Sequence, residues 1–133
     1  MDAQTEVRRT VALAALVQCA TRELCRRFRD GEPASDPPPE VIDENKWLAA
    51  RHGLAAELLQ LPGGERRTVR ELTAELLDRL GEHARALGCE RELAGIADIL
   101  ERGTGADRQR IVWEANHDLD EVVADLVARS GAE

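Results

Sequence analysis

The residues best suited to ligand chemistry lie between Glu44 and Gly53, in a chain otherwise built mainly of Ala, Leu, Arg and Glu. Glu44, Trp47 and Arg51 are three and four residues apart, so they share one face of a predicted helix. Asn45 lies beside them. A guanidinium can bind a carboxylate or a phosphate through two parallel hydrogen bonds. Two interpretations stay open: a ligand-contacting face, or a core anchor at Trp47 beside an ordinary ion pair of Glu44 and Arg51.

A second unusual segment runs from Gly103 to Arg110 and contains Arg108 and Gln109. Two glycines precede a predicted helix there, and backbone N–H groups at a helix start can bind an anion. The segment lacks the Lys-Ser/Thr pair of a phosphate-binding P-loop and the buried strand before it. A plain helix-start turn is therefore the simpler interpretation, although Arg108 and Gln109 can still reach a neighbouring site.

Other catalytic or metal-binding patterns do not emerge from the sequence. His52, His83 and His117 are scattered, with no carboxylate at ligand spacing, and are predicted to be surface or helix-capping residues. No order of Ser, His and Asp suggests a catalytic triad. The three cysteines match no zinc or disulfide framework, so we expect reduced thiols, with Cys19 buried, and no bound metal.

The charge balance and the short apolar runs exclude two classes of partner. The 26 acidic and 18 basic residues give a formal net charge of -8, without a coherent basic face or aromatic platforms. Binding to nucleic acid is therefore not expected. The apolar run 11–17 is far shorter than the roughly 20 residues of a membrane span. We expect a cytoplasmic protein that does not bind a membrane.

The first half of the chain is predicted to hold two helices and a linker. Apolar residues recur at threes and fours over residues 5–29, and the middle of this helix is apolar nearly all round. That pattern suggests a partner surface outside this chain. Residues 30–39 are rich in proline and form a linker. A second helix should begin at these prolines, with Ser35 or Asp36 near its N-cap, and end at His52 before Gly53.

Residues 40–133 complete a mainly α prediction with at most one small β-hairpin. The turn signal Pro62-Gly63-Gly64 lies between two short segments that fit the hairpin. Thr68 and Glu71 form a capping box, so a third helix should begin near Val69 and stop at Gly88. Further helices are expected at Glu90–Glu101, Ala106–Ala115 and Leu119–Arg129. The last of them should bury Val122, Val123, Leu126 and Val127. We interpret residues 1–133 as a single helical region.

Four blocks in order resemble the C-terminal part of the type 2 glutamate–cysteine ligase family, the ATP-dependent carboxylate–amine ligases. The blocks are Val11-Ala12-Leu13-Ala14-Ala15-Leu16-Val17-Gln18, Glu44-Asn45-Lys46-Trp47 with Ala50-Arg51-His52-Gly53-Leu54, Ala84 to Gly88-Cys89, and Gly103-Thr104-Gly105-Ala106-Asp107-Arg108-Gln109-Arg110. The resemblance covers nearly the whole chain. A full family member is more than twice as long, and its N-terminal part has no counterpart here.

The resemblance implies an enzyme that uses ATP and Mg²⁺ to phosphorylate a carboxylate, which an amine then attacks. It also implies a glutamine-synthetase-like α+β fold, in which helices surround a curved antiparallel sheet that binds the ATP and the metals. This chain would be the helical region that packs on the sheet, inactive without the N-terminal half. The substrate- or ATP-proximal residues would be Asn45, Trp47, Arg51, Arg108 and Gln109.

The partner would be the N-terminal half of the ligase, in the same or a separate chain, and a homo-oligomer is possible. The chain can be a fragment, a natural split subunit, or a frame read from an interior Met. The alternative function is a stand-alone helical interaction module without catalysis, which uses an exposed apolar helix to dimerise.

Overall fold

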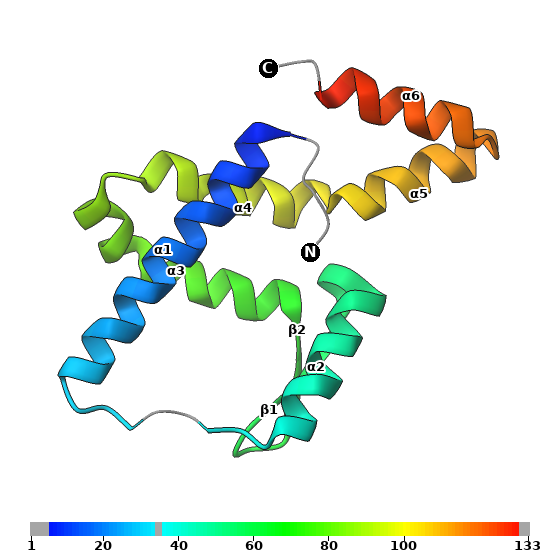
Figure 1. The fold of residues 1–133 in the computed structure, drawn as a ribbon. Helices are drawn as coiled ribbons and strands as arrows, with labels where there is room; N and C mark the ends of the chain where they lie inside the picture. The colour runs from blue at the N-terminus through cyan, green and yellow to red at the C-terminus, as the bar shows by residue number, and fades with distance from the viewer. Residues whose placement is uncertain (1–5, 34–35, 131–133) are drawn as a thin grey trace. The chain divides into compact units, whose positions relative to one another are not determined.

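The computed structural model describes residues 6–33 and 36–130 (Figure 1). The helices are α1 (Val7–Arg29), α2 (Pro39–His52), α3 (Val69–Leu87), α4 (Glu90–Arg102), α5 (Gly105–Asn116) and α6 (Leu119–Ser130), with a 3-10 turn, η1, at Gly53–Ala55. The strands β1 (Glu57–Gln60) and β2 (Glu65–Thr68) form a two-stranded antiparallel sheet. The prediction of a mainly helical chain with one small hairpin is confirmed.

The chain divides into two compact units, and each is described by itself. One unit is Gln18–Gly88; the other combines the residues up to Val17 with those from Cys89 onward. The single helical region predicted for residues 1–133 stays a prediction.

In the unit Gln18–Gly88, the hairpin packs against α2 and continues directly into α3 (Figure 1). Leu59 lies opposite Arg66 in the register of the two strands. Thr68 and Glu71 form the predicted capping box: the Thr68 hydroxyl accepts from the Glu71 amide, and the Glu71 carboxylate accepts from the Thr68 amide. Local sequence signals therefore set both the turn and the start of α3.

The same unit has a small core where α1 and α3 supply the buried residues. Cys19, Leu80 and Ala84 are almost completely inaccessible to solvent. The ring of His83 on α3 lies 2.8 Å from the carboxylate of Glu23 on α1. Cys19 is buried as predicted, and no disulfide joins the cysteines that the structure describes.

In the other unit, the first part of α1 packs closely on α4. A Cβ built on Gly95 of α4 would lie only 2.9 Å from the Cβ of Ala12 on α1. Leu93 and Ile96 of α4 are buried with Ala12 and Ala15. Small residues where α1 crosses α4 therefore allow these two helices to approach closely.

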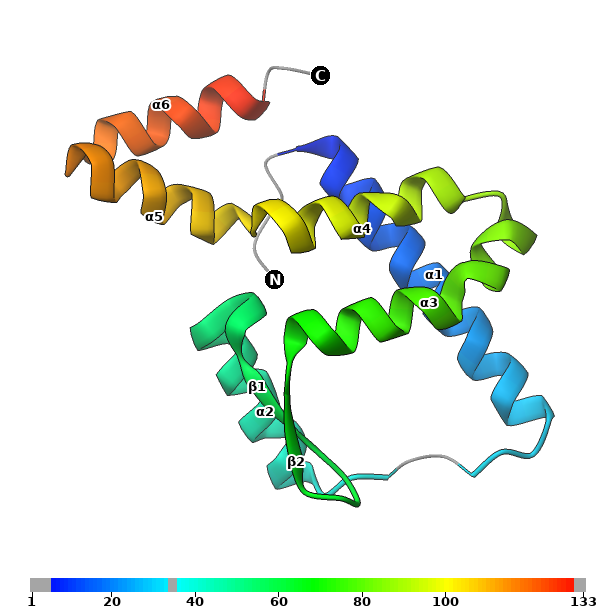
Figure 2. The ribbon, with the colours of Figure 1, turned by 180° about the vertical axis from the view of Figure 1, so that it is seen from behind.

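Helices α5 and α6 lie side by side and are joined by a short turn (Figure 2).

Two expectations about burial and capping are corrected. Val123 and Val127 of α6, predicted to be buried, are exposed. The N-cap of α2 is Pro38 rather than Asp36, because Pro39 is already the first helical residue. Ser35 lies outside the described residues. Within residues 6–33 and 36–130, no helix is long and apolar enough to cross a membrane.

Candidate functional site

The candidate site on α2 consists of Trp47, Arg51 and His52 near the end of the helix. Gly53 ends α2 with a φ of 57°, a backbone conformation that favours glycine. The guanidinium of Arg51 lies 5.4 Å from the centre of the Trp47 ring, within the range of a cation–π contact. The His52 ring meets the Trp47 ring edge-on, with 6.5 Å between centroids. The exposed Trp47 ring therefore contacts both the Arg51 guanidinium and the His52 imidazole at the surface.

Trp47 does not serve as a core anchor, because 58% of the residue is exposed. Glu44 does not pair with Arg51 either: its carboxylate lies 3.1 Å from the Arg66 guanidinium on β2. Among the residues that the structure describes, Arg51 makes no ion pair. The packing interpretation of this segment is therefore wrong for Trp47 and for the predicted ion pair, and Arg51 keeps its guanidinium available for an anionic group.

Asn45 connects α2 to the hairpin through both ends of its side-chain amide. Its Nδ2 donates to the Leu59 carbonyl at 3.0 Å, and its Oδ1 accepts from the Leu59 amide at 2.9 Å. Both groups are partly buried. The amide retains one N–H and one lone pair for any further contact. Asn45 thus positions the helix that carries Trp47 and Arg51, and contact with a substrate stays a prediction.

Replacing Asn45 with alanine is expected to lower the free energy of unfolding of the chain by about 1.5 kcal/mol, because the partly buried Leu59 amide and carbonyl lose their partners. Urea unfolding of the wild-type and variant chains measures this change. Asn116→Ala is the matched control, since Asn116 is exposed and donates only to Val112 within its own helix. Equal losses in the two variants would contradict the role assigned to Asn45.

The Gly103–Gly105 segment forms a helix cap. The Thr104 hydroxyl accepts from the Asp107 amide, and the Asp107 carboxylate accepts from the Thr104 amide at 2.8 Å and from its hydroxyl at 2.7 Å. The hydrogen bond from the Thr104 side chain is the main reason why the pKa of Asp107 is lowered. An anion at this helix start would have to compete with that carboxylate, so the simpler interpretation of the segment, a helix-start turn, is the one observed.

Arg108 on α5 is paired with Asp125 on α6. Its Nη2 lies 2.7 Å from the Asp125 carboxylate, which raises the pKa of Arg108 above its usual range. Gln109 is exposed, and its side chain makes no hydrogen bond to any described residue. Arg108 therefore links α5 to α6 through an ion pair. Contact of Arg108 or of Gln109 with a substrate stays a prediction. Asn45, Trp47 and Arg51 lie in one compact unit and Arg108 and Gln109 in the other.

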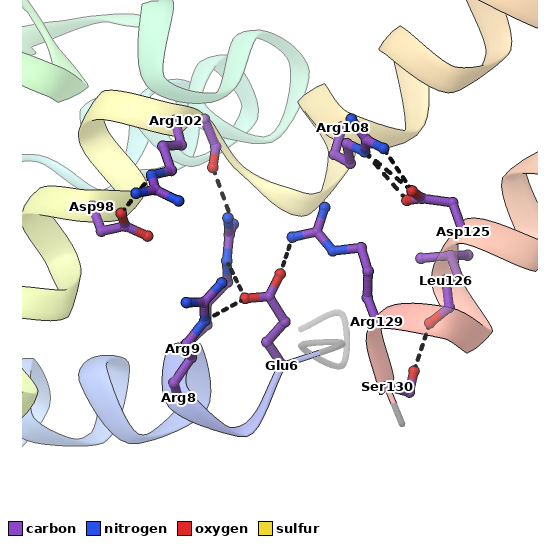
Figure 3. Close-up of polar contacts among 11 residues, drawn as sticks. Glu6, Arg8, Arg9, Asp98, Arg102, Arg108, Asp125, Leu126, Arg129 and Ser130 are labelled. Carbon is purple, nitrogen blue, oxygen red and sulfur yellow. Dashed lines mark hydrogen bonds and ion pairs between the residues drawn. The ribbon is translucent and has the colours of Figure 1, made fainter. Parts of the chain in front are cut away.

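A buried charge cluster around Glu6 was not predicted (Figure 3). The Glu6 side chain is only 5% exposed and contacts Arg8, Arg9 and Arg129. Arg9, 9% exposed, also donates to the Gly103 carbonyl at 3.0 Å. The close spacing of Glu6, Arg8 and Arg9 could have signalled the local part of this cluster. No local pattern could have indicated Arg129, which lies at the other end of the chain.

The histidines have three different surroundings. His117 has a φ of 52° and caps the end of α5, as predicted for a capping residue. His52 is exposed, as predicted for a surface residue. His83 is partly buried and bound to Glu23, so its prediction as a surface or capping residue is wrong. The pKa of Glu23 is lowered, chiefly by the hydrogen bond from Arg26 and further by His83.

The described residues show no cluster of metal-ligating side chains. Within residues 6–33 and 36–130 no group of three or more His, Cys, Asp or Glu side chains could hold a metal ion. Magnesium is usually held by one or two carboxylates together with waters and the phosphates of a bound nucleotide. We therefore assign no step through ATP or a metal to side chains of this chain.

The structure thus combines a mainly helical chain with an exposed Trp47–Arg51 pair at the end of α2. Residues 1–129 match the family described as "Glutamate-cysteine ligase family 2". The chain belongs to this family. Among solved structures, none matches it.

Curated relatives carry the name "Putative glutamate--cysteine ligase 2", with numbered variants. Form 2-3 of Rubrobacter xylanophilus is 45% identical over 98% of this chain and 34% of its own length. The form from Sorangium cellulosum is 40% identical over 97% of this chain and 34% of its own length. The form from Clavibacter sepedonicus is 44% identical over 90% of this chain and 32% of its own length. The chain thus spans about a third of the length of the curated relatives it matches.

Proposed function

We propose that this chain is the C-terminal helical portion of an ATP-dependent carboxylate–amine ligase of the glutamate–cysteine type. The observation that carries the proposal is the family match over residues 1–129, together with relatives about three times as long. The remaining portion of the ligase would bind ATP and Mg²⁺, and this chain alone would be inactive. Its cellular location would be the cytoplasm.

Within the proposed ligase, Trp47 and Arg51 form one wall of the active site. Both side chains are exposed, and the Arg51 guanidinium is available to bind a carboxylate or a phosphate. Asn45 positions this wall through Leu59. Arg108 and Gln109 are weaker candidates for contact with the substrate or ATP. The Arg108 guanidinium would first have to leave Asp125.

The test is a chimera in which this chain replaces the matching third of the Rubrobacter xylanophilus relative 2-3. We expect ADP formation that depends on an acid and an amine substrate, first tried as glutamate and cysteine. Arg51→Ala should lower kcat/KM about ten- to hundredfold, as for loss of a hydrogen bond to a charged group. The matched control is Arg70→Ala, because Arg70 is exposed on α3 and has no ion pair among the described residues.

The outcomes separate the parts of the proposal. A folded chimera without turnover, beside an active parent enzyme, would reject the ligase function. Turnover that survives Arg51→Ala unchanged would remove Arg51 from the mechanism. A stable homodimer of this chain by light scattering, with no ATP-linked activity in the chimera, would favour the stand-alone interaction module.

A further inference from the structure

Helix α1 has two opposite faces of different character. Ala12, Ala15 and Cys19 face the protein interior and are buried. The opposite face carries residues at alternate spacings of three and four, which we call the α1 seam. The α1 seam consists of Val7, Thr10, Ala14, Val17, Thr21, Leu24 and Phe28, all of them exposed.

The α1 seam is long and contains large apolar side chains. Val7, Val17, Leu24 and Phe28 are between 62% and 84% exposed. The 23 residues of α1 extend over about 34 Å. The spacing of 3.5 residues on average matches the contact line of two helices that cross at about 20°. An exposed apolar stripe of this regularity indicates a helix-binding surface.

The positions that flank the α1 seam carry no charge over most of its length. They are Val11, Leu13, Gln18, Ala20 and Cys25, and only the last flanking position on α1, Arg27, is charged. In a two-helix coiled coil surrounded by water, the flanking positions are often Glu and Lys, which form ion pairs between the helices. The wide uncharged face of α1 instead suits burial inside a larger protein body.

We propose that the α1 seam packs against a helix in the two thirds of the ligase that lie outside the region matched by this chain. This inference rests on the proposed function. The length of the relatives supports this occupant, because about 66% of the Rubrobacter relative lies outside the 34% that the chain covers. The lack of flanking charges from Val11 to Cys25 favours it over a second copy of this chain.

The first test uses the chain alone. Val17→Asp and Leu24→Asp should change its melting temperature by no more than about 2 °C, because both positions are exposed and surface substitutions have small effects. A loss of more than about 8 °C, well beyond that surface effect, would show that the chain itself already buries the α1 seam and would overturn the inference.

The second test measures thiol labelling in the intact chimera and in the chain alone. Val17→Cys is placed in a Cys25→Ser, Cys89→Ser background, where the remaining Cys19 is buried. Maleimide labelling should slow by about 100-fold in the chimera, because a buried thiol reacts only after local opening. Arg22→Cys is the matched control: Arg22 is an exposed α1 residue off the seam, and its labelling should change by less than about threefold.

Equal labelling of Val17→Cys in the chain and the chimera would overturn the inference. Protection in the chain alone that increases with concentration, with a dimer in light scattering, would assign the seam to a second copy. ADP formation in the same chimera tests the proposed function separately. Protection of the thiol without ADP formation would support the α1 seam as a docking surface and reject the ligase function. ADP formation without protection would support the ligase function and reject the docking surface.

Discussion

Replacing Glu6 with glutamine is expected to lower the free energy of unfolding by about 3 kcal/mol. The substitution keeps the shape of the side chain and removes its charge. Arg9 is nearly as buried as Glu6, and its Nε, 3.4 Å from the Glu6 carboxylate, makes no good hydrogen bond to any described residue. Without Glu6 a buried guanidinium would lose its counter-charge. Equilibrium unfolding in urea measures the change.

Glu101→Gln serves as the matched control for Glu6. Glu101 is exposed on α4 and has no ion pair in the part of the chain that the structure describes. Its substitution should change the free energy of unfolding by less than about 0.5 kcal/mol. If Glu6→Gln falls within that range, the Glu6 cluster contributes no net stability. A double variant with Arg129→Gln then shows whether the contact between Glu6 and Arg129 contributes, because only coupled residues give non-additive changes.

Gly95→Ala should destabilise the chain by about 2 kcal/mol, although alanine is the better helix former. The new Cβ would meet the Ala12 Cβ at 2.9 Å, and both atoms are fixed directly to helix backbones. Overpacking costs up to about 3 kcal/mol and helix propensity regains about 1 kcal/mol. Thermal unfolding of the variant measures the net effect.

Gly81→Ala is the control for Gly95→Ala and should have the opposite sign. Gly81 lies inside α3, and a Cβ there would meet nothing within 4 Å. The substitution should raise the free energy of unfolding by about 0.5 to 1 kcal/mol. Stabilisation by both alanines would mean that α1 and α4 do not approach as closely as the structure shows.

Local signals in the sequence predicted most helix boundaries. Thr68 and Glu71 start α3, Gly88 ends it with a φ of 67°, and Pro62-Gly63-Gly64 separates β1 from β2. Each signal acts within four residues, because capping and turn geometry involve only neighbouring backbone groups. The resemblance to the ligase family likewise depended on short blocks in order, and the family match confirms it.

Features that depend on distant residues were not predictable in the same way. On α1 the small residues Ala12 and Ala15 are buried, while the larger Val17 and Leu24 on the opposite face are exposed, because small residues allow the close approach of α4. One of the two interpretations of the Glu44–Gly53 segment paired Glu44 with Arg51 along the helix, but Glu44 contacts Arg66, 22 residues away. Spacing along one helix shows which residues share a face, not what that face meets.

The two hydrogen bonds between Asn45 and Leu59 also limit which strands can pair with the hairpin. A β-strand at the edge of a sheet exposes backbone groups that recruit further strands and promote aggregation. On the outer edge of β1, Asn45 occupies the amide and carbonyl of Leu59, and Arg66 donates to the carbonyl of Glu57 at 3.4 Å. A strand from elsewhere would have to displace these side chains before it could extend the sheet through β1. These contacts therefore oppose the addition of a third strand at the β1 edge of the hairpin.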